Sequence, residues 1–434
     1  MKRCKSCGQG LSNEDRISQL PESLLLQILS LLPTTEVVAM SVLAKRWRYL
    51  WKMVPNLEFI DYGKYDLETF SNIVCRCLLS HQAPFLQRLH LEMSFDSGSS
   101  IDIGLLLGIA FGRQLRELVL ESYSGKSFRF PTSLYYCETL ETLELYHCIL
   151  IHVPFPVCLK SLRTLHLHVM EYKDDESVVN LFSGCISLEN LVVHQSTEFS
   201  LKTFTIAVPS LQRLTLMADN ECEENSVYVI NAPSLKYLKI EGILEDGSCL
   251  IENNTPELVE ASIIGVSRVV FESILGSLYL VKRLSLKIGS PLEIKFPTGS
   301  IFHHLIYLEI HTNEPEWWNL LMLMLDTSPK LQVLKLIGDW FSKGHRGAYR
   351  RWNQPKHVPE GLLLCLVTLV WTYYEGLIKD EKEVAKYILR NASRLKKATF
   401  SNKYSLSEEK LERLKELENV VMASNSCQLV FESI

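Results

Sequence analysis

Two cysteines near the beginning of this 434-residue chain are the first residues whose types and spacing could support chemistry. Cys4 and Cys7 stand in a Cys-x-x-Cys pattern, which is half of a structural zinc site. No second pair of cysteines or histidines follows at the usual distance, so we predict no metal site there. A RING finger needs two complete zinc sites and is excluded for the same reason.

Three histidines form a second candidate group. His166, His168 and His194 fall on polar positions of neighbouring predicted strands, where the fold could bring them together. Such a surface could bind a metal or respond to pH near neutrality. Solvated strand residues are the more common outcome, and we favour that interpretation. We therefore predict no metal and no cofactor for this chain.

Residue patterns for catalysis are missing from the sequence. The chain has no G-x-x-x-x-G-K-[ST] loop to cradle a phosphate, and no nucleophile and base stand in a recognisable frame. No residue favours an isomerase or a hydrolase. We predict that the protein is not an enzyme and that any catalysis resides in a partner.

An internal repeat predicts the strands that must hold these polar side chains in place. A Leu-x-x-Leu-x-Leu pattern, with conservative exchanges, begins at Leu86, Leu115, Leu140, Leu162, Leu188, Leu211, Leu235, Leu258, Val281, Leu305 and Leu331. The intervals run from 22 residues, between Leu140 and Leu162, to 29 residues, between Leu86 and Leu115. This period is typical of leucine-rich repeats. The alternative is an ordinary α/β domain with leucine-rich strands.

Each repeat contains a short alternating segment such as Leu143-Glu144-Leu145. In a strand, the leucines would point to one face and the polar residue to the other. One such strand cannot bury its apolar face alone, so neighbouring repeats must stack. The predicted fold class is α/β: a leucine-rich-repeat solenoid with a curved sheet and helices on its convex side.

The polar strand positions are the candidate binding face of this solenoid. Glutamates occupy it in the early repeats, and lysines and arginines occupy it in the later ones, which would orient a partner of complementary charge. The acidic positions are Glu92, Glu117, Glu121 and Glu144, and the basic ones are Arg213, Lys239, Arg283, Lys287 and Lys335. Our candidate target-binding residues are Glu117, Glu144, His166, Arg213, Lys239, Arg283 and Lys287.

Residues 15–51, "DRISQLPESLLLQILSLLPTTEVVAMSVLAKRWRYLW", precede the repeats and are rich in large apolar side chains. Pro21 and Pro33 bound a first predicted helix, and a second is expected from Thr34 or Thr35 through Trp51. The first helix has one apolar stripe, formed by Leu24, Leu25, Ile28, Leu29 and Leu32. An all-α segment this short buries too little surface to be stable by itself. We therefore expect part of the apolar stripe to be covered by a partner.

Composition limits the classes of partner. The net charge of −5 and the pI near 6.2 give no general attraction to nucleic acid or to anionic membranes. No apolar run is long enough to span a bilayer, and the N-terminus lacks the apolar core of a secretory signal. We expect a soluble intracellular protein of the nucleus or the cytoplasm, with neither nucleic acid nor membrane as a partner. The 12 cysteines then behave as small buried apolar residues.

The N-terminal segment from Asp15 to Phe59 closely resembles the F-box of plant F-box/leucine-rich-repeat proteins. The resemblance lies in the Leu20-Pro21 pair, the SVLAKRW turn and the trailing VPNLEF. It implies docking on the Skp-type adaptor of a cullin–RING ubiquitin ligase, the SCF complex. It also implies adaptor contacts by Leu20, Pro21, Leu24, Leu25, Ile28, Leu29, Leu32, Val37, Val42, Trp47 and Leu50. Alternatively, the segment is a helical cap on the first repeat, and some of these residues must form its own core.

A second resemblance covers residues 352–400, which look like the FBD domain that follows the repeats in many plant F-box proteins. Trp-x-x-Pro, Val-Pro-Glu, Tyr-x-Gly and YILRNASRLKK occur in the expected order, with Gly361 where the family often has cysteine. Physically, this region extends the solenoid, with two more strands after Leu366 and Leu395 and a helix over 380–392. A capping box at Ser405 predicts a further helix, and CQLVF a last strand.

We therefore predict a flexible N-terminus at 1–14, an F-box at 15–60, a repeat solenoid at 61–345 and an FBD-like region at 346–434 that continues and caps it. The predicted function is that of the substrate-recognition subunit of an SCF-type ligase. Its partners would be a Skp-type adaptor, through it the cullin and RING subunits, and an unknown target protein. The alternative is a leucine-rich-repeat protein-binding scaffold that acts outside a ubiquitin ligase.

Overall fold

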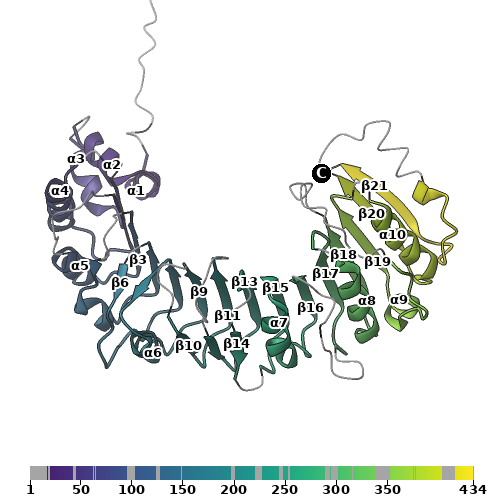
Figure 1. Ribbon diagram of the computed structural model, residues 1–434. Helices are drawn as coiled ribbons and strands as arrows, with labels where there is room; N and C mark the ends of the chain where they lie inside the picture. Colours follow the sequence, from purple (N-terminus) through teal and green to yellow (C-terminus); the bar gives the residue numbers. More distant parts are fainter. Residues whose placement is uncertain are drawn as a thin grey trace, which may run out of the picture. The chain divides into compact units, whose positions relative to one another are not determined.

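The computed structural model describes residues 17, 20–42, 45–61, 63, 65–94, 103–123, 128–147, 149–196, 201–219, 227–243, 248–252, 255–288, 294, 302–314, 316–338, 352–374, 376, 378–402 and 416–433 (Figure 1). The chain divides into two compact units, Met1–Lys126 and Ser127–Ile434. The predicted flexible segment 1–14 and the predicted helix after Ser405, up to residue 415, lie outside the described residues.

The first unit begins with short helices that are separated as the prolines predict. They are α1 (Glu22–Leu29), α2 (Thr34–Met40), α3 (Trp47–Leu50) and the 3-10 helix η1 (Trp51–Met53). Pro21 and Pro33 directly precede α1 and α2, with φ of −56° and −54° that suit a helix start. The second predicted helix does not run unbroken to Trp51, because α2 ends at Met40 and α3 starts again at Trp47.

Two strand-helix repeats follow in the same unit. Their elements are β1 (Asn56–Ile60), α4 (Leu67–Ser80), β2 (Arg88–Met93), α5 (Ile103–Phe111) and β3 (Glu117–Ser122). Asp66 caps α4, since its carboxylate accepts a hydrogen bond from the Thr69 amide at 2.8 Å. The three strands are parallel, and Glu58 in β1 is in register with His90 in β2. The sheet thus aligns polar residues from successive repeats.

The second unit holds a long parallel sheet in which sequence order is also spatial order. Its strands are β5 (Thr142–Tyr146), β7 (Thr164–His168), β9 (Asn190–Gln195), β11 (Arg213–Ala218), β13 (Tyr237–Glu241), β15 (Glu260–Val266), β16 (Arg283–Ile288), β17 (Tyr307–His311), β18 (Val333–Ile337), β19 (Thr368–Thr372), β20 (Lys397–Asn402) and β21 (Gln428–Ser433). Leu143 and Leu145 are buried while Glu144 is half-exposed, as the alternation predicts. The predicted α/β leucine-rich-repeat fold is confirmed.

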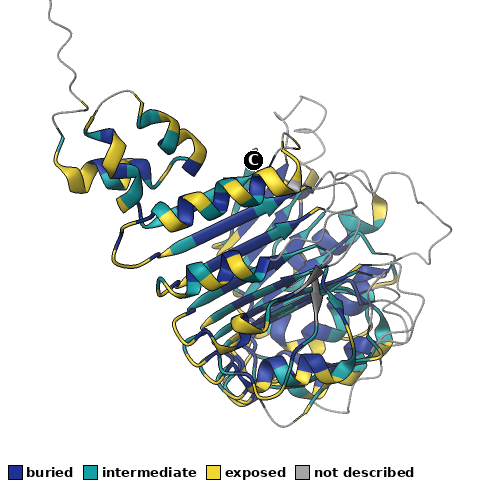
Figure 2. Cartoon of the chain, turned by 90° about the vertical axis from the view of Figure 1, so that its left-hand side faces the viewer, coloured by how far each residue is buried: buried dark blue, intermediate teal, exposed yellow. Residues whose placement is uncertain are grey.

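Helices and short strands cover the apolar face of this sheet. The helices are α6 (Asp175–Ser183), α7 (Arg268–Ile274), α8 (Trp317–Thr327), α9 (Glu360–Leu364), α10 (Lys379–Asn391) and the 3-10 helices η2 (Thr132–Tyr136) and η4 (Leu275–Ser277). Figure 1 shows α7, α8 and α9 on one side of the sheet. The helices have one buried and one exposed side (Figure 2), which the repeat packing requires.

Some repeats carry a strand where the sequence analysis predicted a helix on this side. Two small parallel sheets occur there, β4 (Phe128–Arg129), β6 (Ile149–Ile151) and β8 (Glu171–Tyr172), and β10 (Thr203–Ala207), β12 (Val227–Asn231) and β14 (Ser248–Ile251). The segments TFTIA and VYVIN alternate and are rich in β-branched residues, which favours strands over helices. The helix-covered description therefore holds for only part of the array.

The predicted FBD-like region continues the sheet of the repeats before it. The two strands expected after Leu366 and Leu395 are β19 and β20, the expected helix is α10, and CQLVF leads into β21. Trp371 in β19 is only 1% exposed. Its ring lies 5.6 Å from that of Trp317 in α8 and 6.2 Å from that of Phe400 in β20. The cluster joins this region to the preceding repeat.

Replacing Gly361 with alanine should destabilise the second unit by about 1–3 kcal/mol, the typical effect of overpacking. A Cβ at Gly361 would lie 2.5 Å from the backbone oxygen of Ser328, so α8 and α9 would have to separate. The close approach leaves no room for a side chain at position 361, which agrees with glycine standing there where the FBD family often has cysteine. Chemical denaturation followed by far-UV circular dichroism measures the effect.

The matched control is Gly276→Ala, because a Cβ there meets no atom within 4 Å. We expect it to change stability by no more than about 0.5 kcal/mol. Equal effects of the two substitutions would contradict the proposed steric cause.

Candidate binding surfaces

The first candidate surface is an exposed apolar patch at α1, which we call the apolar ledge: Leu24, Ile28 and Leu31. These side chains are 44%, 43% and 84% exposed. Leu31 lies just after α1, but its amide donates to the carbonyl of Ile28 at 3.1 Å, so the helical turn continues. Positions i, i+4 and i+7 lie on one face. That spacing is visible in the sequence, yet the predicted contact set omitted Leu31.

The other side of the same helices forms a core of their own. Leu25, Leu29, Val37, Trp47 and Leu50 are each at most 7% exposed and pack together. These five side chains, which belong to the predicted adaptor contact, therefore also form the core of the segment, and their burial leaves little of their surface accessible.

The remaining predicted contact residues are accessible to different degrees. Pro21 is exposed and Val42 is 84% exposed, whereas Leu20 and Leu32 are half-buried against the core. The guanidinium of Arg46 donates to the Leu20 carbonyl at 2.9 Å and fixes the chain before α1. The accessible part of the predicted contact therefore comprises Leu24 and Ile28 of the ledge together with Pro21 and Val42.

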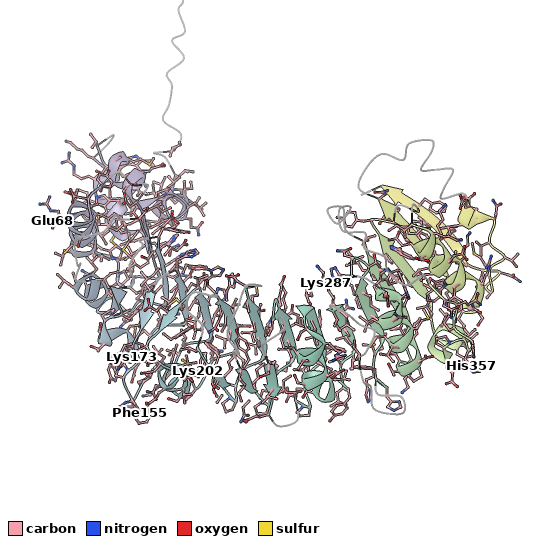
Figure 3. The ribbon with its side chains drawn as sticks, in the orientation of Figure 1. Glu68, Phe155, Lys173, Lys202, Lys287 and His357 are labelled. Atoms are coloured by element: carbon pink, nitrogen blue, oxygen red, sulfur yellow. The ribbon has the colours of Figure 1, made fainter. Side chains whose placement is uncertain are left out.

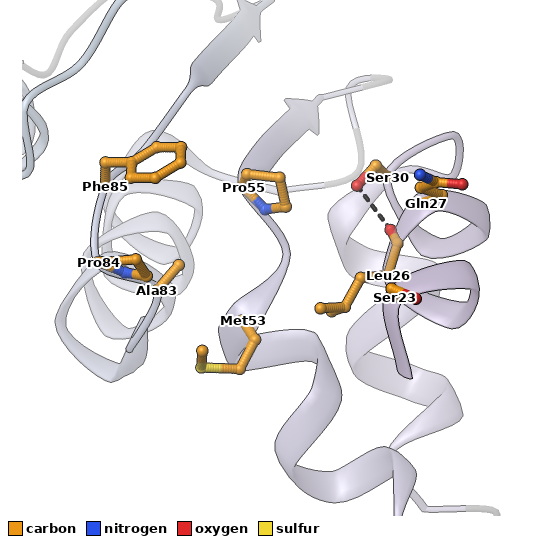
Figure 4. A pocket seen from close by; sticks show the side chains of 9 residues that line it. All are labelled: Ser23, Leu26, Gln27, Ser30, Met53, Pro55, Ala83, Pro84 and Phe85. Atoms are coloured by element: carbon orange, nitrogen blue, oxygen red, sulfur yellow. Dashed lines mark hydrogen bonds between the residues drawn. The ribbon is translucent and has the colours of Figure 1, made fainter. Parts of the chain in front are cut away.

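A pocket of about 360 Å³ lies beside α1 in the first unit (Figure 4). It is lined by Ser23, Leu26, Gln27, Ser30, Met53, Pro55, Ala83, Pro84 and Phe85. The Ser30 hydroxyl donates to the Leu26 carbonyl at 2.7 Å, so one of its few polar groups is already paired. An apolar lining of this kind suits an apolar side chain and offers no catalytic group.

A compact polar cluster lies on β1, β2 and β3 of the first unit. The two ring nitrogens of His90 face Glu58 Oε1 at 3.0 Å and Glu121 Oε1 at 3.2 Å. Glu92 stands close to both His90 and Glu121. Its pKa is raised by burial and by the nearby negative charge of Glu121 and Glu58, although His90 opposes the shift.

The three histidines singled out in the sequence do not form one site. His166 lies 3.5 Å from Glu144. His168 and His194 form a separate pair, with Nε2 and Nδ1 2.8 Å apart, and His194 Nε2 lies 2.9 Å from the Asp219 carboxylate. All three are half-exposed strand residues, and each lies close to a polar side chain of a neighbouring repeat.

The later strands present a mixed face and not the basic one that their cations suggested. The strand cations have nearby carboxylates: Lys239 with Glu241 at 2.6 Å, Arg283 with Glu260 at 3.7 Å, Lys287 with Glu314 at 3.7 Å and Lys335 with Glu309 at 2.9 Å. Arg213 stacks on the Tyr237 ring at 4.3 Å. In Figure 3, Lys287 lies on the side of the sheet away from α7.

Glu309 is partly buried on this face, in a cluster with Lys335, Ser285 and Tyr307. Burial alone would raise the pKa of Glu309, but hydrogen bonds from Lys335, Ser285 and Tyr307 outweigh it and lower that pKa. Burial, together with the negative charge of Glu309, raises the pKa of Tyr307 to about 12. Both groups therefore keep their ordinary charge states near neutral pH.

The predicted target-binding residues all lie on strands of the two units, at positions that point away from the leucine core. Glu117 pairs with Arg88 at 3.2 Å within the first unit. The other six, Glu144, His166, Arg213, Lys239, Arg283 and Lys287, occupy half-exposed or exposed positions of the second unit. The fold thus places them on the same kind of surface, the polar side of parallel strands.

Burial makes two cysteines of the second unit unreactive. It raises the pKa of the Cys185 and Cys249 thiols to about 12, so neither is a thiolate near neutrality. Within the part of the chain that the structure describes, no helix is both long and apolar enough to cross a membrane.

Comparison with known proteins identifies the three regions separately. The F-box domain family matches residues 17–59, and the FBD family matches residues 354–400. A repeat family described as "FBD-associated F-box protein At5g56370, LRR repeats" matches residues 103–258. The F-box/FBD/LRR-repeat protein At3g26920 of Arabidopsis thaliana is 67% identical over 435 residues, covering 99% of each chain. The chain belongs to the F-box/FBD/LRR-repeat family.

Further relatives from Arabidopsis thaliana agree along the whole length. The putative F-box/FBD/LRR-repeat protein At4g13965 is 54% identical and covers 100% of each chain. The F-box/FBD/LRR-repeat protein At3g52680 is also 54% identical, covering 96% of this chain and 93% of its own. The resemblance seen in the sequence is thereby confirmed, and the apolar ledge lies in the F-box of this family member.

Proposed function

We propose that this F-box/FBD/LRR-repeat protein is the substrate-recognition subunit of an SCF-type cullin–RING ubiquitin ligase. The observation that supports this most directly is the apolar ledge, which leaves Leu24, Ile28 and Leu31 uncovered on a segment that matches the F-box family. In this proposal, the ledge docks on a Skp-type adaptor, which connects the chain to the cullin and RING subunits.

Apolar burial dominates the proposed docking. Covering a leucine or isoleucine fully contributes up to about 1.5–3 kcal/mol, and the ledge has three such side chains. The exposed charges nearby, such as Arg48, would add at most about 1 kcal/mol each. Association costs several kcal/mol, so the contact should also recruit Leu20, Pro21, Leu32 and Val42 around the ledge.

The target protein is proposed to bind the polar strand face of the repeats. Within each unit, backbone pairing holds the strands in register, and acidic and basic groups are mixed among their polar positions, which suits recognition by charge pattern. The proposed contacts are Glu117, Glu144, His166, Arg213, Lys239, Arg283 and Lys287.

In this role the protein acts by proximity and not by chemistry of its own. Holding the target beside the ubiquitin-loaded enzyme converts a bimolecular transfer into an almost unimolecular one. No group in the described residues is required to act as a nucleophile or a base. The nucleus or the cytoplasm is the proposed place of action.

Reconstitution from purified components tests the proposal. The full chain should co-purify with a Skp-type adaptor in a one-to-one complex, and addition of cullin, RING and charged conjugating enzyme should transfer ubiquitin to the target. Proximity labelling with the proteasome inhibited identifies that target. Failure to bind any adaptor would reject the proposal. Adaptor binding without ubiquitin transfer to a captured protein would favour a scaffold outside a ligase.

A further inference from the structure

We propose that the first unit contains a binding site for a divalent transition-metal ion of the zinc class, formed by His90, Glu92 and Glu121. The site goes beyond the proposed ligase function, because neither adaptor docking nor target binding requires a metal. Glu58 is its positioning residue.

The spacing of the ligand atoms suits such an ion. One nitrogen of His90 and one oxygen each of Glu92 and Glu121 all lie within 4.8 Å of one another. His90 Nε2 is 3.2 Å from Glu121 Oε1. Zinc binds nitrogen and oxygen at about 2.0–2.2 Å, so two ligands of a tetrahedral site lie about 3.3–3.6 Å apart. Small side-chain rotations complete the coordination.

The surroundings of His90 also point to a cation. Its side chain is only 11% exposed, and each ring nitrogen faces a carboxylate oxygen, Glu58 at 3.0 Å and Glu121 at 3.2 Å. An imidazolium would donate an N–H to each carboxylate, whereas a neutral imidazole carries one N–H and would direct the lone pair of its other nitrogen at a carboxylate. A metal ion between Nε2 and Glu121 removes this repulsion.

Glu58 and Tyr123 fit the roles that surround a metal site. With the Nδ1 hydrogen of His90 donated to Glu58, Nε2 is left unprotonated and able to bind the ion. The Tyr123 hydroxyl donates to Glu121 Oε2 at 3.0 Å, which leaves Oε1 to face the metal. Such outer hydrogen bonds orient metal ligands in proteins.

The local charge favours a cation as well. Glu58, Glu92 and Glu121 bring three carboxylates to one histidine, and Arg88 pairs instead with Glu117. Three protein ligands leave one coordination position open, as in sites that take water or an external group. The sequence analysis predicted no metal here, because Glu58, His90 and Glu121 are separated by about thirty residues at each step and only the strand register joins them.

Titration of the full chain with zinc chloride and with cobalt chloride tests the proposal. The protein should carry Cys4→Ser and Cys7→Ser, so that the Cys-x-x-Cys pair cannot bind zinc. Calorimetry should show one zinc per chain, and cobalt should give the visible absorption of a tetrahedral site. His90→Asn, Glu92→Gln and Glu121→Gln should each weaken binding at least about 100-fold, and Glu58→Gln by about 10–100-fold.

The second unit provides the matched control. Glu144 and His166 form a similar pair at 3.5 Å, and among the described residues they are not part of a set of three groups that could hold a metal ion. Glu144→Gln and His166→Asn should therefore leave zinc binding unchanged. Circular dichroism checks that every variant is folded. The proposal is overturned if the parent protein binds no stoichiometric metal, or if the substitutions at His90, Glu92 and Glu121 weaken binding no more than the controls. These outcomes are independent of adaptor binding.

Discussion

Replacing Leu24 and Ile28 with aspartate should abolish capture of a Skp-type adaptor. Both side chains are more than two-fifths exposed, so the change leaves the F-box core intact. Both side chains are already more than half covered, so losing their remaining contacts would cost about 1–3 kcal/mol, and desolvating two carboxylates adds to that. Because 1.4 kcal/mol is a factor of ten, the dissociation constant should rise at least about 100-fold. Calorimetry with purified adaptor measures it.

The control for this prediction is Leu79→Asp, in α4 of the same unit. Leu79 is 64% exposed, so an aspartate is as well tolerated there, but it lies outside the F-box match. It should bind the adaptor as the parent does. Wild-type affinity in the Leu24/Ile28 double variant would show that the ledge is not the docking surface.

The two faces of α1 show how far a sequence can go toward such a site. Apolar periodicity predicted the helix and its apolar stripe correctly, because a period of 3.6 residues can be seen in the amino-acid sequence without any structure. It could not separate Leu25 and Leu29, which are buried, from Leu24 and Ile28, which are exposed. That division depends on where α2 and α3 pack, and tertiary packing is not encoded in a local pattern.

The repeats also show that a sequence pattern predicts local structure better than contacts between distant residues. The predicted repeat beginning at Leu235 forms a strand in which the buried Leu238 and Ile240 alternate with half-exposed residues, whereas the short strand β12 on the helix side went unpredicted. Helices lie on that side in some repeats and short strands in others, and the β-branched residues of β10 and β12 favour strands there. The cluster around His90 was equally hidden, since it arises from register across strands. Sequence therefore predicted the elements better than the contacts between them.

Replacing Trp371 with alanine should destabilise the second unit by about 3–5 kcal/mol, the usual cost of removing a large buried aromatic side chain. Trp371 is 1% exposed, and its ring contacts those of Trp317 at 5.6 Å and Tyr374 at 4.9 Å. Chemical denaturation of the full chain measures the loss. Trp352→Ala is the control, because Trp352 is half-buried and, among the described ring pairs, meets only Tyr387, edge to face with the ring centroids 5.7 Å apart. Its cost should be clearly smaller.

The same variant distinguishes a continued solenoid from a separate FBD domain. Trp317 belongs to α8, before the FBD match at 354–400, whereas Trp371 lies inside that match. If one core runs through both, amide hydrogen exchange in Trp371→Ala should speed up in α8 as well as in β19 and β20, because stacked repeats share their stability. Faster exchange confined to 354–400 would show instead that the FBD region unfolds by itself. The continuous register of β18 with β19 leads us to expect the shared response.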